Sequence, residues 1–138
     1  MSPVLHGTGR VLLALYFLVP GIMKVLGWSD TVSMVDRHDV PFPEAAVAVS
    51  IIANIAGAIL LIANRHVRLT ALGFVLYIIL VNALLHDFWN FEGIEAAHEL
   101  QNFIKNLGIL AGLLVLAGAS PKRSLSIGTL FQRDPTLA

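Results

Sequence analysis

The chain has no cysteine and few charged residues, and both shortages restrict what it can be. Without cysteine, thiol–disulfide exchange, cysteine-ligated iron–sulfur clusters and covalent attachment of c-type haem are excluded. Charged residues make up 13% of the 138 residues, whereas soluble domains carry about 25%. Too little charge remains to cover a water-soluble globule, and a formal net charge of zero provides no basic field for nucleic acid.

Apolar residues take the place of the missing charge. They make up 57% of the chain, and the mean hydropathy is +0.79. Four apolar runs approach the length needed to cross a bilayer. They predict one all-α domain over residues 1–119, an integral membrane four-helix bundle, followed by a tail over residues 120–138. The expected helices cover about residues 10–28, 43–63, 69–88 and 99–119, with a polar loop at residues 29–42.

The distribution of basic residues predicts the orientation of this bundle. Four spans place both termini and the turn at residues 64–68 on one side of the membrane. That side carries six basic residues, Arg10, Arg65, Arg68, Lys122, Arg123 and Arg133. The other side carries three, Lys24, Arg37 and Lys105. Because basic residues are enriched in cytoplasmic loops, both termini are predicted to be cytoplasmic, and the link between the third and fourth helices faces outward.

Small residues form two faces that are typical of close helix packing in lipid. One face lies on the second expected helix and the other on the fourth, where Gly108 and Gly112 are four residues apart. On these faces helix backbones are expected to approach one another, or to contact another membrane protein. The face on the second helix consists of Ala46, Ser50, Ala53 and Gly57.

Four short motifs resemble those of the DoxX family. They are Gly9-Arg10, Gly21-x-x-Lys24, His86-x-Phe88-Trp89 and Phe103-x-Lys105-Asn106-Leu107. In this order, with four spans, they make the chain similar to that family from about residue 9 to residue 119. The resemblance implies a four-helix bundle in the bacterial or archaeal cytoplasmic (inner) membrane. The family's namesake is a small subunit associated with a thiosulfate:quinone oxidoreductase or a terminal quinol oxidase.

Polar residues gather near the outward ends of three expected helices. Asn82 and His86 are four residues apart and would share a helix face, with Trp89 one turn further along it. Lys24 lies near the end of the first helix at the same expected depth. Since polar side chains avoid lipid, we expect this set to face the bundle and to form a ligand-binding site. The candidate residues are Lys24, Asn82, His86, Trp89, Asn102, Lys105 and Asn106.

A quinone head group suits these donors, because its carbonyls accept hydrogen bonds while Tyr16, Phe88 and Trp89 would provide flat walls. Two alternatives compete with this interpretation. Lys24 and Lys105 would instead extend to the membrane interface or form structural ion pairs with the nearby acids. A metal site is the weaker alternative, since Glu95 and His98 have the Glu-x-x-His spacing of di-iron bundles but lack a second such motif.

The sequence therefore predicts a small accessory subunit of a quinone-linked membrane redox complex. No intrinsic cofactor is expected apart from a possible bound quinone. The expected partners are the lipid bilayer and other membrane subunits or further copies of the chain, not nucleic acid. One alternative is a small-molecule or ion carrier, for which Asn54 within a span and Pro20 as a helix breaker are the indications. Another is a quinone-linked oxidoreductase that acts without a partner.

Overall fold

The computed structural model describes residues 2–135, and every regular element in this range is helical. Four of its segments are long and apolar enough to cross a membrane, which confirms the predicted all-α, four-span fold. The elements are α1 (Pro3–Leu26), α2 (Trp28–Asp36), α3 (Pro43–Ile62), α4 (Val67–Leu85), the 3-10 helix η1 (Phe88–Asn90), α5 (Gly93–Gly118) and α6 (Ile127–Leu130).

The helix boundaries differ from the predicted ones at several points. Helix α1 begins at Pro3 rather than near residue 10, because Ser2 caps it by accepting a hydrogen bond from the Leu5 N–H at 3.5 Å. Helix α4 ends at Leu85, three residues before the predicted end. Helix α5 begins at Gly93 rather than near residue 99. The start of α1, the end of α4 and the start of α5 therefore lie several residues away from the positions predicted from the apolar runs.

The prediction of a continuous polar loop at residues 29–42 was wrong, because its first part is helix α2. Gly27 ends α1, and the Thr31 hydroxyl donates a 2.8 Å hydrogen bond to the Gly27 carbonyl. Asp30 lies in the first turn of α2, where an acid interacts favourably with the helix dipole. Val35 is buried and holds α2 against the bundle. These local signals outweigh the polar composition of the segment.

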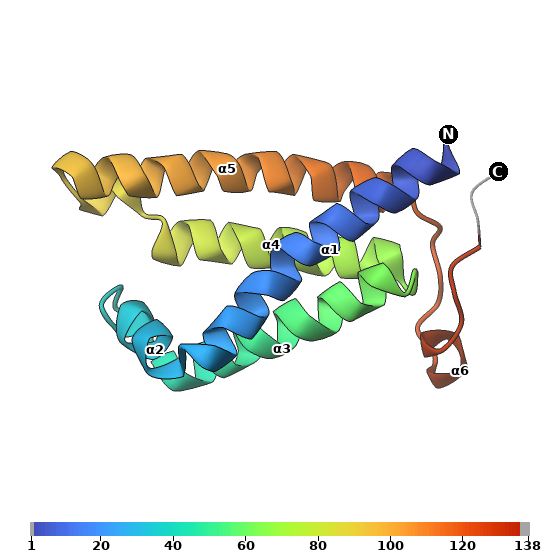
Figure 1. Ribbon diagram of the computed structural model, residues 1–138, viewed down its shortest axis with the longest axis horizontal. Helices are drawn as coiled ribbons and strands as arrows, with labels where there is room; N and C mark the ends of the chain where they lie inside the picture. Colours follow the sequence, from blue (N-terminus) through green and yellow to red (C-terminus); the bar gives the residue numbers. More distant parts are fainter. Residues whose placement is uncertain (1, 136–138) are drawn as a thin grey trace.

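The bundle consists of two helix pairs, since α1 packs mainly on α3 and α4 mainly on α5 (Figure 1). Phe17 of α1 and Phe74 of α4 stack with ring centroids 3.7 Å apart and join the two pairs. Around these rings the buried core contains Ala14, Leu61, Ile78 and Leu113. The core therefore extends from the middle of the spans to the end of the bundle where α3 and α5 end and α4 begins.

The three glycines of the predicted small-residue faces, Gly57, Gly108 and Gly112, meet side chains or open space rather than helix backbones. A Cβ atom added to Gly57 would lie 2.5 Å from Cζ of Phe74, so this glycine makes room for the stacked ring. A Cβ atom added to Gly112 would lie 3.7 Å from the nearest side-chain atom of Leu13. Within the described residues, no heavy atom lies within 4 Å of a Cβ added to Gly108. The predicted approach of backbones at Gly108 and Gly112 is therefore not found within the bundle.

Two arginines bind the carboxyl ends of neighbouring helices at the end of the bundle where α1 begins. The Arg10 guanidinium donates to the carbonyls of Leu61 and Ile62 in the last turn of α3. Arg68 donates to the Ala117 carbonyl at 3.1 Å, near the end of α5. The Leu61 and Ala117 carbonyls also accept backbone N–H groups from the turns that follow, those of Asn64 at 3.1 Å and Ser120 at 3.3 Å. Each guanidinium therefore adds a charged donor to a helix end.

Asp134 caps the amino end of α4 from the opposite end of the chain. His66 precedes α4 in the left-handed conformation, with φ of 45°, and its own side chain provides no cap. The buried Asp134 carboxylate instead accepts the N–H groups of His66 and Val67 at 3.1 and 2.8 Å. Arg123 pairs with the same carboxylate at 3.0 Å. The C-terminal segment is thereby fixed against α4.

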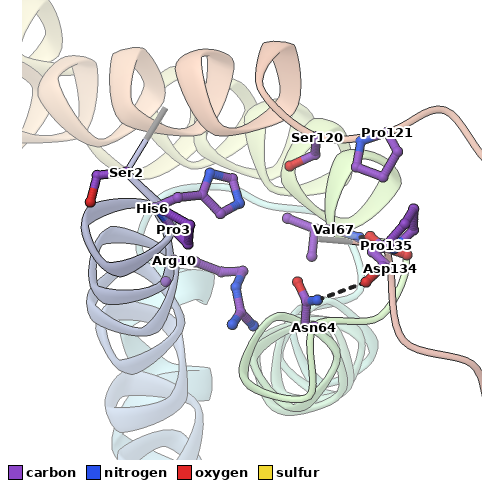
Figure 2. A pocket seen from close by; sticks show the side chains of 11 residues that line it. Ser2, Pro3, His6, Arg10, Asn64, Val67, Ser120, Pro121, Asp134 and Pro135 are labelled. Carbon is purple, nitrogen blue, oxygen red and sulfur yellow. Dashed lines mark hydrogen bonds between the residues drawn. The ribbon is translucent and has the colours of Figure 1, made fainter. Parts of the chain in front are cut away.

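A hollow of about 100 Å³ lies beside this cap (Figure 2). His6 and Arg10 of α1 line it, together with Asn64 from the turn after α3 and Ser120 after α5. Asn64 donates to the Asp134 carbonyl at 3.1 Å. The ends of the spans thus meet around one polar centre. Which side of the membrane this centre faces stays a prediction.

We expect Gly57→Ala to destabilise the bundle relative to Gly73→Ala. Both substitutions raise helix propensity by about 1 kcal/mol. Only the methyl group at position 57 would meet the Phe74 ring, whereas the space at Gly73 is open, and overpacking of a core costs about 1–3 kcal/mol. Thermal unfolding of the two variants in detergent measures the difference. Equal stabilities would show that Phe74 moves without cost.

Replacing Asp134 by alanine should lower the free energy of unfolding by about 1–3 kcal/mol, because it removes both a helix cap and a buried partner of Arg123. Asp134→Asn keeps an acceptor, so its free energy of unfolding should lie between those of the wild type and Asp134→Ala. Asp36→Ala, which removes an exposed carboxylate, is the control. Chemical unfolding in mild detergent tests the series, and equal effects of the substitutions at positions 134 and 36 would contradict the assigned cap.

Candidate functional site

The predicted site residues do not form a single site in the structure. Asn82 and His86 were expected to share one face of a helix, with Trp89 beyond them. Helix α4 ends at Leu85, and His86 at its C-cap has φ of −118° and ψ of 43°. The helix ends before His86, and the two side chains have different partners, the Phe103 carbonyl for Asn82 and Glu99 for His86. The predicted set separates into three groups.

Lys24 forms the first group with two residues that the prediction did not include in the site. Its ammonium donates hydrogen bonds to Tyr77 Oη at 2.7 Å and to Ser50 Oγ at 3.2 Å. Its Nζ also lies 5.4 Å from the centre of the Tyr77 ring. The ion pairs among residues 2–135 are His86–Glu99 and Arg123–Asp134. The alternative in which Lys24 pairs with an acid is therefore wrong.

An apolar cavity of about 430 Å³ adjoins this lysine, and we call it the α2 pocket. Met34 and Val35 of α2 line one side, and the loop at residues 40–42 continues that wall. The other walls come from α3 and α4 and are mostly aliphatic. Lys24, Ser50 and Tyr77 are among the few polar residues that line it, with Thr31. An apolar pocket with a few convergent polar groups is typical of a small-molecule site.

Among the described residues, two hydrogen-bond donors near this cavity have no acceptor. An ammonium group has three N–H donors, and Lys24 uses two of them on Ser50 and Tyr77. The Tyr77 hydroxyl accepts from Lys24 and keeps its own proton for a further bond. Phe17 and Phe74 contact the Tyr77 ring edge-on, at centroid distances of 6.1 and 6.4 Å. These contacts fix the orientation of the phenol.

Asn82 and Asn106 belong to a second group, which links three spans inside the bundle. Asn106 Nδ2 donates to Asn82 Oδ1 at 2.8 Å, and Tyr16 Oη donates to Asn106 Oδ1 at 2.7 Å. Asn82 Nδ2 donates to the Phe103 carbonyl at 3.2 Å. Both asparagines are buried. Because their amide groups are occupied by one another and by neighbouring helices, this group holds α1, α4 and α5 together.

The third group lies at the rim between α4 and α5. His86 Nδ1 and Glu99 Oε2 are 2.6 Å apart. Phe88 and Trp89 of η1 pack edge-on against Phe103 of α5, at centroid distances of 5.4 and 6.3 Å. These contacts connect the rim to α5. None of these residues lines the α2 pocket, so the walls predicted from Phe88 and Trp89 lie elsewhere.

The remaining predicted residues lie apart from these groups. Asn102 is half-buried, and Lys105 is exposed on α5. Glu95 and His98, which carried the metal alternative, are both exposed near the start of α5. Among the described residues, no group of three or more His, Cys, Asp or Glu side chains is placed to hold a metal ion.

Sequence reasoning missed Ser50 and Tyr77 as partners of Lys24. Ser50 was assigned to a small-residue face, and Tyr77 was not included among the candidate residues. A signal was present, since a lysine, a serine and a tyrosine occurred in three different apolar runs. Polar side chains in separate spans tend to pair in order to avoid lipid. The pairing itself depends on helix rotation, which the sequence does not specify.

The four spans and the α2 pocket define a multi-pass membrane helix bundle with a cavity between its helices. Residues 7–87 match the DoxX family, and the chain belongs to that family. It is 28% identical over 119 residues to the inner membrane protein YphA of Escherichia coli (strain K12), an alignment that covers 86% of this chain and 85% of that protein. No solved structure matches. The resemblance and the membrane location predicted from the sequence are both confirmed.

The Asn82–Asn106 hydrogen bond should be measurable as a coupling energy. We expect a double-mutant cycle of Asn82→Ala and Asn106→Ala to give about 0.6–1.7 kcal/mol, the range of such bonds inside membrane bundles. The control cycle pairs Asn82→Ala with Asn102→Ala, because Asn102 lies on the same helix as Asn106 but is only half-buried. Unfolding in detergent provides the energies. Equal coupling in both cycles would refute a specific bond.

Proposed function

We propose that this protein binds a quinone in the α2 pocket, as a small accessory subunit of a quinone-linked membrane redox complex. The observation that carries the proposal is the pair of free donors beside the cavity, one on Lys24 and one on Tyr77. A quinone carbonyl is an acceptor without a proton of its own, so it complements two donors. The aliphatic walls suit the apolar ring substituents and the first part of the tail.

The charge at the site favours a carbonyl compound over a neutral hydrocarbon. Lys24 is without a carboxylate partner within the described residues, and an ammonium group in low-dielectric surroundings is costly unless it is well hydrogen-bonded. A bound carbonyl oxygen adds a third acceptor to Ser50 and Tyr77. It would also stabilise negative charge that develops on the oxygen during reduction, because opposite charges interact more strongly in an apolar pocket.

The role as an accessory subunit rests on the family. The resemblance to DoxX implies association with quinone-linked oxidoreductases, and this chain belongs to that family. In this proposal a partner subunit carries out electron transfer, while the α2 pocket positions the quinone. The exposed apolar side chains of the four spans contact lipid and that partner.

A carrier for an ion or a small molecule is a second candidate, favoured by Asn54. This side chain is 2% exposed within α3, and its Oδ1 has no hydrogen-bond partner among the described residues. Gly21, next to Pro20 within the unbroken helix α1, lies against it, with 3.0 Å between a Cβ atom added there and Asn54 Cβ. A polar group at this depth is typical of a transport path. Flux into proteoliposomes that is lost in Asn54→Leu would favour this candidate over the redox subunit.

The quinone proposal predicts that Lys24→Met and Tyr77→Phe each weaken quinone binding by roughly 10- to 100-fold, the equivalent of about 1.5–3 kcal/mol for a hydrogen bond to a charged group. Both substitutions conserve side-chain volume, so the bundle should still fold. Lys105→Met removes an exposed lysine outside the pocket and is the matched control. The measurement is the quinone content of protein purified in mild detergent, together with titration of delipidated protein by a short-tailed quinone.

The same purification tests the partner. We expect a membrane oxidoreductase subunit to co-purify with the wild-type chain. A preparation without quinone and without a partner would contradict the redox-subunit proposal. Turnover of quinone by the isolated chain with an electron donor would instead make it an oxidoreductase in its own right.

A further inference from the structure

A third hollow, distinct from the α2 pocket and from the hollow beside the Asp134 cap, lies at the end of the bundle where α4 begins. We call it the basic hollow. Its volume is about 180 Å³. Arg68, Lys122 and Arg123 line it together with His66, Leu69 and Leu72. Three cationic side chains and His66 thus face a small space whose remaining walls are apolar.

The charges around the basic hollow are not balanced within the described residues. Arg123 pairs with Asp134 and donates to the carbonyls of Gln132 and Arg133. Arg68 uses Nη1 on the Ala117 carbonyl, and a guanidinium has five N–H donors in all. Lys122 is exposed. With three cations and one carboxylate, the hollow carries net positive charge and favours an anion.

His66 provides an independent indication of a ligand. This residue lines the basic hollow and is only 4% exposed. Its Nε2 atom is buried and has no hydrogen-bond partner among residues 2–135. A buried polar nitrogen without a partner is costly, and such atoms usually bind water or a ligand. An anionic oxygen in the hollow would satisfy it.

An apolar groove lies next to the basic hollow along α4, and the two share lining residues. Its volume is about 310 Å³, and it lies between α3 and α4. We call it the α4 groove. His66 and Leu69 line both the hollow and the groove, while Gly73 leaves space within the groove. Leu125 and Leu130 of the C-terminal segment form another part of its wall. A cationic hollow beside an apolar groove matches a molecule with an anionic head and a hydrocarbon chain.

We propose that this end of the protein binds one anionic phospholipid. The phosphate group lies in the basic hollow, where it accepts hydrogen bonds from Arg68, Lys122 and His66. One acyl chain lies in the α4 groove and passes Leu69 and Gly73. A free phosphate ester would satisfy the hollow but not the groove, so the lipid is the ligand that uses both. Basic residues at a membrane surface attract anionic lipids in the same way.

The probe is phosphatidylglycerol, compared with phosphatidylcholine that carries the same two oleoyl chains. Each is titrated into the delipidated full-length chain, and bound lipid is counted by native mass spectrometry. We expect phosphatidylglycerol to bind at least about tenfold more tightly. Lys122→Glu should weaken it by roughly five- to 25-fold, since each basic residue near the surface contributes a free energy equivalent to about fivefold. The matched control is Arg37→Glu, an exposed charge reversal outside the hollow.

A second variant tests the groove separately from the charge. Gly73→Leu adds a side chain where the groove has open space, so it should weaken both lipids while leaving the preference for phosphatidylglycerol in place. Equal affinity for the two lipids, or equal weakening by Lys122→Glu and Arg37→Glu, would overturn the proposal. Displacement of phosphatidylglycerol by glycerol phosphate in modest excess would assign the hollow to a soluble phosphate ester and would also overturn it.

Discussion

The need to pair backbone groups at the ends of the membrane spans shapes one end of this bundle. A bilayer offers little water to such groups, and at this end side chains from other elements replace it. Arg10 binds the end of α3, Arg68 the end of α5, and Asp134 the start of α4. Each contact joins elements that are distant in sequence. The C-terminal segment is thereby held against α4, and its position creates both the basic hollow and one wall of the α4 groove.

The opposite end of the bundle is built differently. There α2 covers the space between α3 and α4, and the α2 pocket occupies that space. Lys24 reaches this pocket from α1 and is held by Ser50 and Tyr77. One end therefore joins its helices through backbone carbonyls and amides, while at the other end α2 and the side chains of three spans enclose an apolar pocket.

Between these ends, buried asparagines and stacked rings hold the spans in fixed positions relative to one another. The Asn82–Asn106–Tyr16 hydrogen bonds connect α1, α4 and α5, and the Phe17–Phe74 stack connects the two helix pairs. Gly57 is required because the ring of Phe74 occupies the place of a side chain there. Since Tyr77 packs against the same two rings, the core that stabilises the fold also orients the phenol beside Lys24.

The sequence by itself determined the membrane environment, the four spans and the family, because hydropathy and short motifs are local properties of the chain. It also identified Lys24, Asn82 and Asn106 as polar residues within the spans. Which of them meet was decided by the tertiary structure alone. Asn82 bonds to the Phe103 carbonyl and His86 to Glu99, so a shared helix face did not give them a shared partner. The partners of Lys24 and Asp134 depend on how whole helices pack, and residue spacing along the chain does not specify that packing.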